Sequence, residues 1–235
     1  PSLRCYTKEL FSRSMLSLKT MKEILMVGIP ISFQMLMESS AFVVAGIMVL
    51  AFGAASVGAY QIGVNMMNVT FMIVIAIGSA TTILTSHIYG RGNFEHLRHT
   101  ANAAFHMGLT WNITIATLYI ALRFVIPTLF TSNEEVIRLT GSMLIFIALF
   151  QVSDCLQALS ISILRGLQDV KVIIPIVFVS YVLINIPAGY LMAFPLGLEA
   201  NGLIIGFIIG LSCCAIMTMM RVRRNIKQLE NKMGN

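Results

Sequence analysis

Two carboxylates stand inside long apolar stretches of this sequence. Glu38 is the only formal charge between residues 27 and 51, and Asp154 is the only one between residues 139 and 164. A charged carboxylate in a membrane-spanning helix costs roughly 2.5–3.5 kcal/mol, so such residues usually face a cavity or a partner. We expect both acids to take up and release a proton or a Na⁺ ion. The alternative is that neighbouring amides and hydroxyls hold the two acids only to fix packing.

Amides accompany both acids at helical spacing. Gln34 precedes Glu38 by one turn, and Gln151 and Gln157 flank Asp154 at i−3 and i+3. Residues at these spacings share one side of a helix, so each acid belongs to a polar stripe on an otherwise apolar helix. We therefore expect the amides to line a cavity together with the acids.

A third polar face and a proline complete the candidate residues. Gln61, Asn65 and Asn68 follow one another at i, i+4 and i+7, and they are expected to line the same cavity. Hydrogen bonding between helices, worth only about 0.6 kcal/mol on average, is the alternative for these amides. Pro30, two turns before Glu38, predicts a hinge, because a proline kink frees carbonyls and gives a helix two conformations. A static kink is the alternative.

The sequence offers no enzymatic chemistry. It has no H-E-x-x-H, G-x-S-x-G or glycine-rich phosphate loop, and one aspartate at membrane depth is too few for an aspartyl dyad. His96 and His99 have no further metal ligand beside them, and the four cysteines lack metal-ligand spacing. We expect a protein that is not an enzyme and has no cofactor.

The elements that position these residues are apolar helices. Hydrophobic residues make up 57% of the chain and charged residues 11%, whereas soluble domains carry about 25% charged residues. Six windows almost free of charge each reach the roughly 20 residues that a spanning helix needs: 27–51, 57–86, 99–122, 139–164, 172–198 and 200–220. They are too long for barrel strands and do not alternate in polarity. The fold class is therefore all-α, a polytopic membrane protein with six transmembrane helices.

Turn and cap signals set the expected helix ends. Helices are predicted over about 21–51, 57–89, 94–124, 133–166 and 169–194, with a sixth after residues 195–197. Asn133 is expected to cap the fourth helix. Glycines at positions 202, 206 and 210 should let another helix approach the sixth closely. Residues 1–20 are assigned to a cytoplasmic connector, 21–228 to the six-helix unit and 229–235 to a cytoplasmic tail.

Charge is distributed unevenly over the predicted loops. Fourteen of the 16 basic residues fall on one side, and only Arg123 and Arg138 fall on the other. This is the positive-inside pattern. It predicts a multi-pass protein of the plasma (inner) membrane with both termini of the chain in the cytoplasm. The net charge of +6 then faces water and anionic headgroups rather than nucleic acid.

Five short motifs carry a family resemblance. The segments are GIPISFQMLME at 28–38, GAYQIGVN at 58–65, YGRGN at 89–93, LRGLQD at 164–169 and LEANG at 198–202. In this order and spacing they resemble the second half of the multidrug and toxic compound extrusion (MATE) family, NorM branch. The resemblance implies the C-terminal lobe of a twelve-helix transporter whose pathway runs between two lobes.

The resemblance also implies roles for single residues. Glu38 takes the position of a functional glutamate, and Asp154 takes that of the aspartate which completes the cation-binding region, a possible Na⁺ site. Phe150 stands where relatives can carry tyrosine, and Val43 stands where some animal relatives carry a second glutamate. The expected activity is export of small amphipathic organic cations in exchange for Na⁺ or H⁺, with the missing N-terminal lobe and membrane lipid as partners.

Two other functions remain open from the sequence. One is a lipid-linked oligosaccharide flippase of the same wider superfamily, which would favour basic residues in its cavity. The other is a non-transporting helical bundle, in which neutralising Glu38 or Asp154 would change stability alone.

Overall fold

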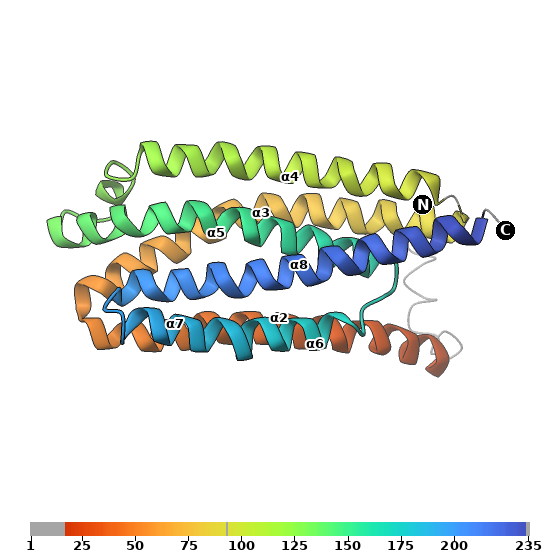
Figure 1. Ribbon diagram of the computed structural model, residues 1–235, viewed down its shortest axis with the longest axis horizontal. Coiled ribbons are helices and arrows are strands. Elements are labelled where there is room, and N and C mark those ends of the chain that lie inside the picture. Colours follow the sequence, from red (N-terminus) through yellow and green to blue (C-terminus); the bar gives the residue numbers. More distant parts are fainter. Residues whose placement is uncertain (1–16, 93, 234–235) are drawn as a thin grey trace, which may run out of the picture.

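The computed structural model describes residues 17–92 and 94–233, and every regular element in this part of the chain is helical (Figure 1). The long helices are α2 (Leu18–Val49), α3 (Ala54–Arg91), α4 (Glu95–Ala121), α5 (Glu134–Gly166) and α8 (Glu199–Met233). Another helix is continuous but divided into α6 (Ile173–Val177), the π-helical segment η4 (Phe178–Asn185) and α7 (Ile186–Ala193). Two short 3₁₀ turns, η2 (Leu50–Phe52) and η3 (Pro127–Leu129), lie in the connections.

The six predicted helices are all present, and five of them have the length and apolar composition of a membrane span. The exception is α4, which has 27 residues and runs alongside the others (Figure 1). Asn102, His106 and Asn112 lower its apolar character. The prediction of an all-α membrane protein is therefore confirmed.

Helix α5 forms the centre of the bundle, because α3, α4 and α8 all pack against it. Within the most apolar window of each helix, 61% of residues are buried in α5 but only 17% in α2. Helix α2 is thus a peripheral element that contacts mainly the α6–η4–α7 helix. Its outer face exposes large apolar side chains such as Ile29, Phe33 and Leu36.

Local capping explains where several helices begin and end. The Asn133 side chain accepts from the backbone N–H groups of Glu135 (2.9 Å) and Val136 (3.3 Å), which confirms the predicted cap of α5. Ser17 caps α2, so residues 18–20 of the predicted connector are helical, while residues 1–16 lie outside the described part. Helix α8 continues past the predicted boundary at residue 228 as far as Met233.

The glycines of α8 permit a close helix contact, as predicted. A methyl group at Gly202 would lie 2.5 Å from the backbone nitrogen of Ala193, and one at Gly210 would lie 2.5 Å from Cβ of Asn185. The partner helix differs from the expected regular helix over 169–194. Residues 169–172 form a turn, and the centre of the helix, between Pro175 and Pro187, is π-helical. A proline lacks the N–H that continues an α-helical ladder, and π turns are one way to accommodate the loss.

The turn after α5 is fastened to α8 by Asp169. Its carboxylate accepts from Nε of Arg221 (2.7 Å) and from Nδ2 of Asn225 (2.7 Å). Burial acts to raise the pKa of Asp169, but the hydrogen bonds from Arg221 and Asn225 and the charge of Arg221 outweigh it, so this pKa lies below its ordinary value. The ionised carboxylate is the form that holds the turn.

Candidate functional site

The two acids, predicted separately, line the same cavity. Glu38 comes from α2 and Asp154 from α5, and the cavity between them has a volume of about 240 Å³. Helix α3 supplies its third wall. The other lining residues are two polar and five apolar or aromatic side chains: Ser39, Asn68, Met35, Phe42, Met67, Phe71 and Phe150.

Glu38 belongs to a network of hydrogen bonds that joins α2 to α5. One turn before it, Gln34 donates from Nε2 to Oε2 of Glu38 at 3.4 Å. The Oε1 atom of Gln34 accepts from the Arg165 guanidinium at 2.7 Å. Arg165 also attracts Glu38 electrostatically. The predicted amide of α2 thus bridges an acid and a cation.

Tyr181 of the π-helical segment η4 is a further member of this network. Its phenol interacts with the carboxyl groups of Glu38 and Asp154. The hydroxyl also lies 3.0 Å from Nε2 of Gln157, which is one turn after Asp154 on α5. A second cavity of about 120 Å³ runs along the network and is lined by Gln34, Glu38, Gln157 and Arg165, among others.

Asp154 is the least compensated charge of the site. Its side chain is only 5% exposed, and no hydrogen bond to its carboxylate is found among the described residues. It also lies close enough to Glu38 for the two carboxylates to repel each other. Burying an ion without a partner is costly. Its charge therefore requires a proton, a cation or a polar group from outside the described residues.

Aromatic rings form the wall of the cavity next to the acids. Phe42 of α2 stacks on Phe207 of α8, with ring centroids 4.4 Å apart. Phe150 meets both rings edge to face at 6.3 and 6.2 Å. Position 150 carries phenylalanine, so this ring offers no hydroxyl to Asp154. Ring faces and carboxylates together suit an organic cation.

The other predicted residues occupy different environments. Asn68 lines the acid cavity, whereas Gln61 and Asn65 lie exposed on α3 and line neither of the two cavities just described. Gln151 is fully buried, and neither atom of its amide has a hydrogen-bond partner among the described residues. Pro30 lies inside α2, which continues through it as a single helix.

Arg165 and Tyr181 are members of the site that the sequence did not reveal. Arg165 is predicted as a basic residue of the cytoplasmic flank, and Tyr181 lies in the uncharged window 172–198, where Ser180 and Asn185 are its nearest polar neighbours. Arg165 could have been found from its motif, since it follows Asp154 by three helical turns on the same helix. Nothing in the sequence places Tyr181 opposite the acids.

The donor atoms of the site suit a small hard cation. Carboxylates, the Asn68 amide and the Ser39 hydroxyl provide oxygen ligands of the kind that Na⁺, Mg²⁺ and Ca²⁺ prefer. Over the described residues there is no group of three or more His, Cys, Asp or Glu side chains that could hold a transition metal. The two carboxylates are the groups of this cavity that can take up a proton or ligate a cation.

Comparisons with known proteins identify relatives of this chain. A family model described as MatE matches residues 30–191. The chain is 33% identical over 201 residues to the multidrug resistance protein NorM of Vibrio vulnificus (strain YJ016), covering 83% of this chain and 44% of that protein. It is 31% identical over 212 residues to the multidrug resistance protein MdtK of Photorhabdus laumondii, covering 88% of this chain and 46% of that protein.

Solved structures share the fold. An outward-facing multidrug resistance MATE family transporter superposes with a TM-score of 0.84 at 20% identity, covering 92% of this chain and 49% of the other. An inward-facing structure gives a TM-score of 0.80 over 92% of this chain and 50% of the other. The chain thus spans about half the length of the relatives and structures that it matches.

Proposed function

The chain belongs to the MatE family, and on this premise we propose that it forms the C-terminal lobe of a secondary active multidrug exporter. The exporter would exchange amphipathic organic cations for Na⁺ or H⁺, and Glu38 and Asp154 would bind the coupling ion. The relatives named NorM and MdtK are multidrug resistance proteins. Their length implies a partner lobe, which would complete the pathway against the exposed faces of α2 and α3.

One observation carries the proposal: Glu38 and the buried Asp154, from different helices, line one cavity walled by aromatic and methionine side chains. The acids suit a cation, and Phe42, Phe71 and Phe150 suit the apolar body of an amphipathic substrate. Flexible methionines allow such a wall to adapt to different shapes.

Ion coupling follows from the charge of the acid pair. A proton removes the repulsion between Glu38 and Asp154, and a bound Na⁺ compensates it. A conformation that brings the acids together is therefore favoured when the coupling ion is bound and disfavoured when it leaves. This differential stability is what an ion needs in order to shift the population of two access states. Pro30, two turns from Glu38, gives α2 a position at which to bend.

Transport by the complete transporter in vesicles tests the two acids. Under an imposed Na⁺ or proton gradient, Glu38→Gln and Asp154→Asn should express and insert normally but lose export of a cationic dye. Glu38→Asp should retain part of it. Glu135→Gln, an exposed acid in the first turn of α5, is the matched control and should export normally.

The same measurements separate the other functions. A non-transporting bundle predicts that neutralising Glu38 or Asp154 alters stability alone, and wild-type dye export by both variants would end the coupling role. A flippase for lipid-linked oligosaccharides would need cations facing its pyrophosphate. In this lobe Arg165 is engaged by Gln34 at the end of the network, and the acid cavity itself contains no basic lining residue. Its polarity supports an organic cation as substrate.

A further inference from the structure

A larger cavity lies on the opposite side of α5 from the acids. Helices α4 and α8 both pack on α5 but barely contact each other. The space between them has a volume of about 740 Å³. Leu156 of α5 contributes to its floor, and it follows Asp154 by two residues, which places it on the opposite helix face. This cavity is therefore separate from the proposed transport site.

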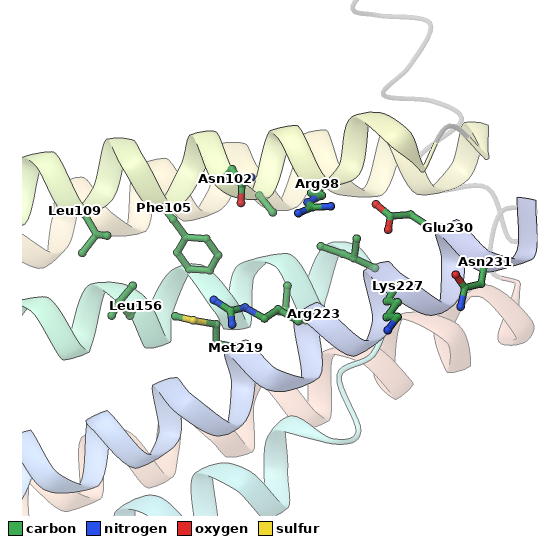
Figure 2. A pocket seen from close by; sticks show the side chains of 13 residues that line it. Arg98, Asn102, Phe105, Leu109, Leu156, Met219, Arg223, Lys227, Glu230 and Asn231 are labelled. Atoms are coloured by element: carbon green, nitrogen blue, oxygen red, sulfur yellow. The ribbon is translucent and has the colours of Figure 1, made fainter. Parts of the chain in front are cut away.

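The cavity changes from apolar to basic along its length (Figure 2). Leu109, Phe105, Leu156 and Met219 line one end, and Arg98, Arg223 and Lys227 line the other. From Met219 to Lys227 the gradient extends about 12 Å along α8. The basic end coincides with the side of the protein that carries most of the basic residues.

The three cations have no protein partner in the described part of the chain. Arg98, Arg223 and Lys227 are exposed, and no ion pair or hydrogen bond of their side chains occurs there. Glu230 is the one acid of the lining, and it lies opposite Arg98 in Figure 2. It offsets one positive charge, so the basic end of the cavity, here called the rim, retains an excess of two positive charges.

We propose that this cavity binds one anionic phospholipid, with its phosphate between the cations of α4 and α8 and an acyl chain along the apolar floor. The order of the lining matches the lipid, because the predicted topology places the cations at the membrane surface and the apolar residues deeper. Charge complementarity selects the anionic headgroup. A soluble anion would leave the apolar end uncovered, so the lipid explains both ends of the cavity.

Quenching by brominated lipids tests the site directly. The complete transporter carries Phe105→Trp as its only tryptophan, with Trp111 and every tryptophan outside this chain replaced by phenylalanine, and is reconstituted in phosphatidylcholine vesicles that contain phosphatidylglycerol. Dibromo-phosphatidylglycerol should quench this tryptophan more strongly than dibromo-phosphatidylcholine at equal content. Equal quenching by the two lipids would overturn the proposal, as would loss of the preference on adding soluble glycerol phosphate.

Matched variants assign the preference to the rim. Arg223→Gln with Lys227→Gln should weaken the relative association by about five-fold per cation removed. The control pair, Arg91→Gln with Arg224→Gln, removes the same charge from the same end of the bundle without touching the cavity lining, and it should keep the preference. An equal loss in both pairs would mean that only general surface charge acts.

A variant that should bind the lipid more strongly controls for misfolding, since misfolding would weaken the preference. Glu230→Gln removes the single acid of the rim and should strengthen the preference for dibromo-phosphatidylglycerol. A weaker or unchanged preference in Glu230→Gln would contradict the proposed placement of the phosphate.

Discussion

The substitution Gly206→Ala tests the closest helix contact of the lobe. Gly206 of α8 faces the backbone of Gly189 in α7, and an added methyl group would lie 2.5 Å from the backbone nitrogen of Gly189 and 3.0 Å from the carbonyl oxygen of Asn185. Carbon atoms in ordinary contact are about 3.5–4.0 Å apart. The two helices must therefore separate by about 1 Å, because a backbone cannot rotate away as a side chain can.

The expected effect combines two opposing terms. Overpacking typically costs about 1–3 kcal/mol, and contact with backbone favours the upper part of this range. Alanine in a helix is more favourable than glycine by about 1 kcal/mol. The net loss in the free energy of unfolding should be about 2 kcal/mol. Because α7 follows directly on the π-helical segment that carries Tyr181, the separation should also loosen the acid site.

Unfolding of the purified protein in mixed micelles with increasing dodecyl sulfate measures this loss. Gly90→Ala is the matched control, since a methyl group there meets nothing within 4 Å. It should leave stability unchanged or slightly higher. If Gly206→Ala proves as stable as Gly90→Ala, the close approach of α7 and α8 is wrong.

Three further predictions follow from local structure and topology. The pKa of Asp169 is lowered in the folded protein, so this residue stabilises the fold at pH values above its unfolded pKa of about 4, and the stabilisation is lost as pH falls through the folded pKa. Asp169→Asn should therefore lower the free energy of unfolding near neutral pH by about 1 kcal/mol and make it less dependent on pH in the acid range. Asn133→Ala should cost about 1 kcal/mol in the same unfolding assay, whereas Asn133→Ser should cost much less. In a chain without its own cysteines, Asn93→Cys and Ser132→Cys should react with an impermeant reagent from opposite sides of the membrane, and labelling from one side would contradict the predicted topology.

The helices could be predicted from the sequence because charged residues avoid the membrane interior, so the uncharged windows between them mark the helices. The apolar windows between basic clusters gave all six helices, and Asn133 and the glycines of α8 act as their residue types predict. Hydropathy failed only in detail. The turn at residues 169–172 and the π-helical centre of the following helix depend on prolines and on the packing of α8, which composition does not encode.

The site was only partly predictable, because a sequence indicates which face of a helix is polar but not where that face points. Glu38 and Asp154 were found from the cost of a buried charge, and the structure brings them into one cavity. The same argument grouped Gln61 with Asn68, yet only Asn68 lines that cavity. Arg165 and Tyr181 reach the acids through the rotation and crossing of three helices, and such geometry leaves no local signal.

The two acids lie on helices that are held very differently, and this difference bears on how the proposed coupling would work. Asp154 belongs to α5, which three helices surround, whereas Glu38 belongs to the peripheral α2. A change of charge between the acids exerts equal and opposite forces on these two helices. Interiors that are densely packed resist displacement, so α5 should stay in place and α2 should respond. The response is limited on one side by the bridge from Gln34 to Arg165, which ties α2 to α5 one turn before Glu38. Ion binding at the acids would therefore move the part of α2 that follows this bridge. A bend at Pro30, which lies one turn before Gln34, would require the bridge to open first.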